Sequence, residues 1–486
     1  MAVKLKVVES SSGIRNVFMR MPFRFGVITK TASPQLTLAV EIEDPDGRRA
    51  TGYAADFLAY RWFDKRPAKT LADNCQDLIQ SVHEARDLYL EAGREGFATP
   101  FDLWRRTYPE IVARGLARDF NKLGASFGAS MFERCIIDAA GRLTGQTYAA
   151  LVRSGLGIDL GRMCEELRGQ QVDTFLPAQP LQHLHLRHTV GLVDPISAAD
   201  RAGDPINDGL PETLEDYLDK DGIRYLKVKI AGNADEDIDR LNAIAAVLDR
   251  REGPFYISLD GNEQHKQIGD FVDLIARIRA TPSLERFYQQ IMFIEQPLDR
   301  SVALDPSVEA GLRELPQDKP VIIDEADGWP EAFREAIALG YRGTSHKNCK
   351  GIYKSLQNIV IASTHNARVG RQELFMSAED LSVVPVVALQ ADLASVALLG
   401  ITHVERNGHH YFRGMGHLSE PEKAAALAAH PDLYERRGDE TFLKVKEGMI
   451  ACASIQVPGM GFACVPDMDR LTPVDAWSFD SLGIQQ

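Results

Sequence analysis

The sequence predicts an α/β fold, a parallel (β/α) barrel of seven or eight units that carries an α+β capping domain. Short apolar runs alternate with helical patterns from about residue 183 to residue 400, as in a parallel sheet or barrel. No GxGxxG motif follows any of these runs, which favours a closed barrel over a dinucleotide-binding open sheet. Charged residues also recur at the ends of the runs, where barrels carry their functional groups.

The N-terminal part reads as mixed α+β. Residues 36–43 and 48–54 are expected to be two strands joined by a turn at Asp46-Gly47, because Asp-Gly between apolar runs is a hairpin signal. Helical patterns follow, and a Pro-flanked segment near residue 180 reads as a linker. We therefore predict a capping domain over residues 1–180 with a returning segment at 455–486, and a barrel over 181–454. The expected helices of the cap are 70–93, 100–117 and 130–145.

The barrel units follow in order along the chain. Each expected strand is a short apolar run bounded by turn residues, and the helices between them have apolar residues at helical spacing. The expected strands are 183–192, 223–230, 255–262, 291–298, 321–327, 344–351 and 371–380, and the expected helices are 235–251, 267–280, 330–340, 352–364 and 383–400.

Composition excludes several classes of protein. The net charge of -14 argues against nucleic-acid binding, which needs a basic surface. Six scattered cysteines form no CxxC pair, so neither zinc fingers nor a disulfide framework is expected. The sequence contains no apolar run of about 18 residues and no signal-peptide pattern. We expect a cytoplasmic protein with no membrane or nucleic-acid partner.

Three carboxylates stand at the ends of successive apolar runs, namely Asp260, Glu295 and Asp324. Parallel strands direct their C-terminal ends into one shared space. Mg²⁺ prefers oxygen ligands, so these residues are candidate ligands for Mg²⁺, with Mn²⁺ as an alternative. Glu325 follows Asp324 directly, and strand alternation lets only one of the two face inward.

Lysines flank this acidic set. Lys227 and Lys229 are two residues apart on one expected strand, so both face the barrel interior. Lys347, about halfway round the ring, approaches from the opposite side. A lysine that gives up its proton in a pocket can act as a base. The pattern indicates proton abstraction α to a carboxylate, whose product a divalent ion stabilises.

The ordered set LKVKI, LDGNE, FIEQP, IIDEAD and SHKNCKG resembles the enolase superfamily, in particular its muconate-lactonizing-enzyme-like branch within the mandelate racemase/muconate lactonizing enzyme family. The resemblance implies a modified TIM barrel with a capping domain. It implies an acid/base pair of Lys229 and Lys347 beside Lys227, and metal ligands at Asp260, Glu295 and Asp324. The implied chemistry is a metal-stabilised enediolate that leads to elimination, racemisation, epimerisation or cycloisomerisation.

The resemblance also bears on the substrate. Segment MPFRFGVITKT lies where the family closes a mobile loop over its pocket, and Arg24 there could bind a substrate carboxylate bidentately. Tyr53 lies near a second cap loop, and Asn262 and Glu379 stand at strand ends. We expect a small-molecule carboxylate as the substrate and a homo-oligomeric enzyme, which could be a dehydratase, ammonia lyase, epimerase or cycloisomerase.

The sequence leaves alternatives open for the second base and for the class of function. The family usually has a Gly-Gly pair after its later lysine, whereas this chain has Asn348-Cys349, so Lys350 competes with Lys347. His346 would serve a His-dependent acid-sugar dehydratase, although no suitably placed Asp follows it. A catalytically idle barrel that binds a ligand is the alternative from another class. We assign His403, His409 and His410 to a surface hairpin rather than to a metal site.

Overall fold

The computed structural model describes residues 4–26, 28–201 and 203–484. An antiparallel sheet forms the cap, with strand order β16-β1-β2-β3. Its long strands are β1 (Lys6–Phe25), β2 (Ile28–Glu43) and β3 (Arg49–Phe57). The turn at Asp46-Gly47 joins β2 to β3 as the sequence predicts, with Gly47 at φ 78° and Asp44 accepting a hydrogen bond from the Arg48 amide at 2.9 Å.

Strand β1 is absent from the sequence-based assignment, and residues 21–25 and 28–31 of the expected cap loop belong to the paired strands β1 and β2. Phe23 pairs with Lys30 and Phe25 with Ile28 across β1 and β2. The polar run ESSSG in β1 has no clear apolar alternation, which hides the strand. Pairing with β2 supplies the hydrogen bonds that make this segment a strand.

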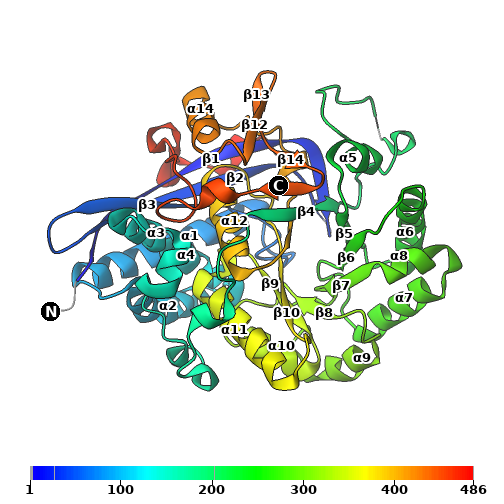
Figure 1. Cartoon of the computed structure of the whole chain (residues 1–486), viewed down its shortest axis with the longest axis horizontal. Coiled ribbons are helices and arrows are strands. Elements are labelled where there is room, and N and C mark those ends of the chain that lie inside the picture. Colours follow the sequence, from blue (N-terminus) through cyan, green and yellow to red (C-terminus); the bar gives the residue numbers. More distant parts are fainter. Residues whose placement is uncertain (1–3, 27, 202, 485–486) are drawn as a thin grey trace.

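Helices α1 (Leu71–Arg94) and α3 (Lys122–Thr144) pack on the cap sheet, and α2 (Pro100–Ala117) packs on these two helices (Figure 1). Thr70 and Asp73 form a capping box at the start of α1, which satisfies free backbone amides there. Helix α3 lies directly on β3 because Gly52 has no side chain. A Cβ at Gly52 would lie 2.0 Å from the Cys135 carbonyl oxygen. The short helix α4 (Tyr148–Ala150) follows.

Eight parallel strands surround the barrel interior. Neighbours pair in chain order from β4 to β10, and β11 pairs back with β4. Between β10 and β11, the Asp380 amide donates to the Glu405 carboxylate at 2.9 Å. The strands are β4 (His183–Val190), β5 (Tyr225–Lys229), β6 (Tyr256–Asp260), β7 (Ile291–Glu295), β8 (Val321–Ile323), β9 (Gly343–His346), β10 (Phe375–Ala378) and β11 (His403–Glu405).

Helices alternate with these strands and cover the outside of the barrel (Figure 1). Helix α12 (Val387–Leu399) differs from the rest because every one of its residues is buried; it contacts both the barrel and β3 of the cap. The other barrel helices are α5 (Leu214–Asp221), α6 (Ala234–Asp249), α7 (Ile268–Ala280), α8 (Glu285–Gln289), α9 (Glu309–Glu314), α10 (Ala332–Leu339) and α11 (Ile352–Val369).

The C-terminal part contacts both barrel and cap. Strand β15 (Met449–Ala451) pairs antiparallel with β4, whereas β16 (Thr472–Pro473) pairs with β1 at Gly13 and Ile14. The expected domain boundaries at residues 180 and 454 stay a prediction. None of the helices in the described ranges combines the length and apolar character that crossing a bilayer needs. The remaining elements are α13 (Gly408–Tyr411), α14 (Glu420–Ala429), β12 (Tyr434–Arg437), β13 (Glu440–Leu443) and β14 (Val445–Lys446).

Candidate active site

The strand ends bring the predicted lysines and carboxylates together. Lys229 is the register partner of Asp260 across β5 and β6, and Asp260 is the partner of Glu295 across β6 and β7. Asp324 follows β8, and Lys347 follows β9. All five are buried. Because equivalent positions of adjacent parallel strands share one face, these side chains form one layer inside the barrel mouth.

Lys227 lies beneath this layer at the centre of four carboxylates. Its Nζ lies 3.0 Å from Asp260, 2.7 Å from Glu295, 2.7 Å from Glu379 and 2.9 Å from Glu405. Burial opposes its charge, but the surrounding carboxylates raise the pKa of Lys227 well above its usual value. These carboxylates therefore hold Lys227 as an ammonium ion at the centre of the acidic cluster.

Two further lysines each pair with one carboxylate. The Lys229 ammonium donates to Asp260, and Lys347 Nζ donates to Asp324 Oδ2 at 2.6 Å. Strands β5 and β9 are four places apart in the ring of eight, so the two lysines approach from opposite sides. Burial opposes the Lys347 charge, but Asp324 raises the pKa of Lys347.

Lys347 and Lys350 differ in what they face. Lys347 lines the cavity above the carboxylates, with its Nζ 4.4 Å from the centroid of the Trp62 ring. Lys350 lies behind Asp324 and donates to Ser345 Oγ at 2.8 Å and to the Asp324 carbonyl at 3.2 Å. Only Lys347 therefore has access to a molecule in the cavity.

The carboxylates of the layer differ in how burial and their neighbours shift their pKa values. Burial and the neighbouring Asp260 and Glu379 raise the pKa of Glu295 well above its usual value. Glu295 Oε2 lies 2.7 Å from Lys227 Nζ but lacks hydrogen-bond geometry to any described residue. Burial opposes the charge of Asp324, yet Lys347 holds the pKa of Asp324 well below its usual value. A concentration of buried carboxylate oxygens fits a hard divalent cation.

Glu325 faces a different side from Asp324. Its Oε1 lies 3.4 Å from Lys65 Nζ and 3.4 Å from Asn262 Nδ2, and burial raises the pKa of Glu325. Asp324 contacts Lys347, on the side of the layer formed by Lys229, Asp260 and Glu295. Of the two adjacent acids, Asp324 is the one that joins this layer.

A small cavity lies above the layer, between barrel and cap. Lys227, Lys229, Lys347 and Asn262 line its floor and walls. Its remaining lining residues come from the cap and from the loops after β10 and β11, and they are Phe23, Phe25, Lys30, Ala59, Trp62, Asp380, Leu381, Ser382, Glu405 and Asn407.

Solved structures with this architecture are similar over nearly the whole chain. One is an enolase from Bradyrhizobium complexed with magnesium and mandelic acid, at 18% identity and TM-score 0.56, covering 95% of this chain and 97% of that one. An N-succinyl Arg/Lys racemase from Bacillus cereus has 17% identity and TM-score 0.56, covering 96% and 98%. A dipeptide epimerase from Enterococcus faecalis, complexed with Mg and L-Leu-L-Tyr, has 14% identity and TM-score 0.57, covering 94% and 99%.

The chain has the mandelate racemase/muconate lactonizing enzyme fold. Other similar structures carry that family's name, including one from Roseovarius nubinhibens at 15% identity and TM-score 0.57, covering 96% of this chain and 99% of that one. No family model and no curated relative matches the sequence. The expected modified TIM barrel with an α+β cap is thereby confirmed as a fold.

Two expected substrate-binding residues lie outside the cavity of this fold. Arg24 is exposed, because alternation along β1 directs Phe23 and Phe25 inward and Arg24 outward. Tyr53 packs on α3, with its ring 5.8 Å from the Arg142 guanidinium and its amide bonded to Asp138 at 3.0 Å. Neither lines the cavity. Asn262 does, and Glu379 lies beneath it against Lys227.

Four residues near the centre were missed by sequence reasoning. Glu405 ends β11 and contacts Lys227, but the apolar run before it is too short to predict a strand. Arg187 on β4 pairs with Glu379 at 2.5 Å, and no charge pattern marks it. Lys30 and Trp62 enter the cavity from the cap, and only the pairing of the cap with the barrel brings them there.

The structure corrects two predictions about histidines, namely the missing partner of His346 and the surface hairpin. Asp392 on α12 does lie beside His346, 3.6 Å from its Nε2, contrary to the expectation that no Asp is suitably placed. His346 nevertheless has its Nδ1 2.8 Å from Ser355 Oγ of α11 and does not line the cavity. The expected surface hairpin is wrong, because His403 belongs to barrel strand β11 and His410 is buried in α13. Segments distant in sequence cover these rings.

Proposed function

We propose that this protein is a Mg²⁺-dependent enzyme of the enolase superfamily that removes the proton α to a substrate carboxylate. The single observation that carries the proposal is the arrangement of Lys229 and Lys347. They enter one cavity from opposite sides, each beside a carboxylate of the Asp260, Glu295 and Asp324 set. A ligand-binding protein has no need of two opposed bases around an acidic centre.

The acidic set fits the cofactor. Asp260, Glu295 and Asp324 would hold Mg²⁺ through carboxylate oxygens, in keeping with the unsatisfied Glu295 Oε2 and the preference of this ion. When bound, the ion supplies stabilisation for negative charge on a substrate carboxylate. Lys227 acts as a fixed cation among the four surrounding acids.

The two lysines then exchange a proton with the α-carbon. The neutral amine of one takes the proton from one face, and the ammonium of the other can return a proton to the opposite face. This arrangement favours racemisation or epimerisation. Elimination remains the alternative outcome, with one lysine as the base and the other as a cation beside the substrate.

The cap supports a substrate with a second anionic group. Lys30 lines the cavity, is 3% exposed, and has no hydrogen bond or ion pair among residues 4–26, 28–201 and 203–484. Its Nζ lies 4.9 Å from the Tyr60 ring centroid and 5.9 Å from that of Phe57. Burial lowers the pKa of Lys30 to about 8. Because an unpaired buried charge is costly, a distal carboxylate of the substrate is its natural partner.

Deuterium exchange tests the proposal. The enzyme is incubated in D₂O with Mg²⁺ and both enantiomers of a panel of N-acyl amino acids and dicarboxylic acids, and α-deuterium is measured by NMR. We expect Lys229→Ala to abolish exchange from one enantiomer of a substrate and Lys347→Ala from the other. Exposed Lys266 provides the matched control. The Lys266→Ala variant should still incorporate α-deuterium into both enantiomers.

Exchange of both enantiomers by the two active-site variants would refute the assignment of the bases. The products distinguish the outcomes, because racemisation returns the same compound with inverted configuration whereas elimination releases water or ammonia. Mg²⁺ titration by calorimetry gives an independent check. Asp324→Asn should weaken Mg²⁺ binding at least about tenfold, as expected when one charged ligand is lost.

A further inference from the structure

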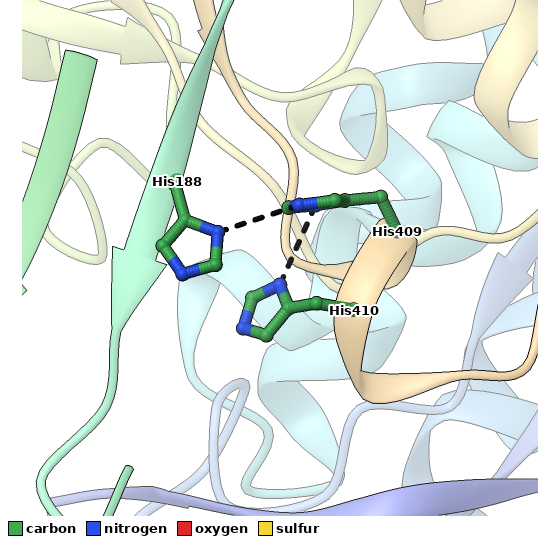
Figure 2. A group of neighbouring side chains, drawn as sticks. All are labelled: His188, His409 and His410. Atoms are coloured by element: carbon green, nitrogen blue, oxygen red, sulfur yellow. Dashed lines mark hydrogen bonds between the residues drawn. The ribbon is translucent and has the colours of Figure 1, made fainter. Parts of the chain in front are cut away.

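Three histidines gather outside the barrel interior, away from the Mg²⁺ ligands proposed above. His188 comes from β4, and His409 and His410 come from α13 (Figure 2). Each offers one ring nitrogen such that all three nitrogens lie within 4.8 Å of one another. His188 and His410 are buried and His409 is partly buried. The catalytic proposal uses none of these rings.

The spacing of the nitrogens suits a metal ion. His188 Nδ1 lies 3.3 Å from His409 Nε2. Two imidazole nitrogens bound tetrahedrally to one zinc ion at about 2.0–2.1 Å are separated by about 3.3–3.4 Å. His410 Nδ1 lies 3.4 Å from His409 Nδ1, and the three rings each offer one nitrogen within 4.8 Å of the others (Figure 2).

The hydrogen bonds of His409 leave the appropriate nitrogen free. His409 Nδ1 lies 2.6 Å from the Arg406 carbonyl oxygen, so it carries the proton and donates, because a carbonyl can only accept. The Nε2 lone pair then points at His188. A ring that donates one nitrogen to a backbone carbonyl and offers the other to a metal is the usual arrangement of a histidine ligand.

His410 and its neighbour contribute a second, independent observation. Neither His410 Nε2 nor Asp194 Oδ1 has a hydrogen-bond partner among the described residues, although both are buried. Asp194 Oδ2 lies 4.0 Å from His410 Nε2. If His410 Nδ1 binds a metal ion, its Nε2–H is directed to the side of the Asp194 carboxylate, the kind of outer partner that histidine ligands usually have.

The local charge permits a cation. Arg20 donates to the His410 carbonyl at 3.1 Å, but its guanidinium is paired with Asp208 at 2.6 Å. A small cavity with space for a water molecule borders His409 and His410, so water could supply a fourth ligand.

We propose that His188, His409 and His410 form a second metal site that takes Zn²⁺ or a neighbouring late first-row ion. Imidazole nitrogen ligands favour such ions, whereas Mg²⁺ prefers oxygen. We expect this site to have a structural role. Helix α13 directly follows Glu405, which contacts Lys227, and Asn407, which lines the catalytic cavity. A metal ion there would join α13 to β4 behind the catalytic cavity.

Co²⁺ provides the probe. Metal-free protein is titrated with Co²⁺ in the presence of saturating Mg²⁺, and the visible absorption of tetrahedral Co²⁺ is recorded with the bound metal counted by mass spectrometry. We expect one equivalent with tetrahedral absorption, displaced by Zn²⁺. His409→Ala and His188→Gln should each weaken binding at least about tenfold. Exposed His183 is the matched control, and His183→Ala should bind as the wild type does.

A second pair of measurements separates this site from the catalytic one. Asp324→Asn should retain the tetrahedral Co²⁺ absorption, and His409→Ala should retain Mg²⁺ binding. Circular dichroism of each variant checks folding, and the partly buried His409 is the position of the three most tolerant of replacement. Loss of the absorption in Asp324→Asn but not in His409→Ala, or unchanged Co²⁺ binding in both histidine variants, would overturn the proposal.

Discussion

A lysine that contacts four acids has a different chemistry from one that contacts a single acid, and Lys227 and Lys229 illustrate this difference two residues apart. Lys227 balances Asp260, Glu295, Glu379 and Glu405. Lys229 pairs with Asp260 and also lines the cavity. The two lysines therefore differ in their surroundings, because Lys227 is enclosed by carboxylates whereas Lys229 also faces the cavity.

Removing the Lys227 charge should destabilise the protein. In Lys227→Met, four buried carboxylates lose their shared cation, and uncompensated buried charges cost about 3–5 kcal/mol. Urea unfolding measures the free energy of unfolding. Surface variant Lys266→Ala should change it by less than about 0.5 kcal/mol. Addition of Mg²⁺ should recover part of the loss, and an unchanged stability of Lys227→Met would contradict the central role of this ion pair cluster.

Lys30 should act on substrate binding rather than on the chemical step. For a substrate with a distal carboxylate, Lys30→Met should raise KM about tenfold or more, since a charge-assisted hydrogen bond contributes about 1.5–3 kcal/mol, while kcat changes little. A substrate analogue with a neutral amide in that place should show no difference between wild type and variant. An equal effect of the variant on both substrates would exclude a distal anion site.

Partly buried His417 should make stability depend on pH. Burial lowers the pKa of His417 to about 4 from about 6.5 in the unfolded chain. The unfolded state binds the proton first, so stability is full above pH 6.5 and declines as pH falls toward 4, by about 3 kcal/mol. Arg15, Glu422 and Lys423 are the charged groups that influence it. His417→Gln should flatten this part of the profile in urea titrations, and an identical slope would refute the assignment.

Close contact between elements is decided by single glycines, and the packing of α3 on β3 is the clearest case. Helix α3 is almost entirely buried, so its position affects both the cap sheet and the loops that reach the barrel. At Gly52 there is no space between the strand and the helix. The helix approaches this closely only because the strand residue lacks a Cβ.

Gly52→Ala and Gly269→Ala should therefore change stability in opposite directions. The new Cβ of Gly52→Ala meets the Cys135 carbonyl at 2.0 Å and the Ala139 amide at 2.3 Å, and overpacking of this kind costs about 1–3 kcal/mol or more. Gly269, within α7, has open space around it, so Gly269→Ala should stabilise by about 0.5–1 kcal/mol. Thermal unfolding measures both, and equal shifts would contradict the packing argument.

The C-terminal segment of the chain contacts both the barrel and the cap. Phe479 is buried against the cap, with its ring centroid 6.0 Å from that of Tyr60, and Trp477 Nε1 donates to Asn16 of β1 at 2.9 Å. The same Tyr60 lies beneath Lys30 of the cavity. The last residues of the chain thus support the cap side of the candidate active site.

Phe479→Ala should lower the free energy of unfolding by about 3–5 kcal/mol, the usual cost of removing a buried phenylalanine ring. Val465, about half exposed, gives the matched control, and Val465→Ala should change stability by less than about 0.5 kcal/mol. Differential scanning calorimetry checks both. If the cap depends on this contact, KM for the substrate should also rise in Phe479→Ala but not in the control.

Sequence patterns were most informative where a local rule applies. Alternation along a parallel strand places Lys227 and Lys229 on one face, and apolar runs predict β5 to β8 and the helices between them. The polar strand β1 and the three-residue strand β11 lack that signal. Arg24 lies outside the cavity for a related reason, because its neighbours Phe23 and Phe25 take the inward positions of the strand.

By itself the sequence determined the barrel order, the acidic set of Asp260, Glu295 and Asp324, and the opposed lysines, because each depends on the period of one strand and its place in the ring. Only the tertiary structure decided which lysine is a permanent cation, that Lys30 enters the cavity, and that His188 meets His409. Those contacts join segments far apart in the chain, and neither composition nor periodicity encodes the distance between them.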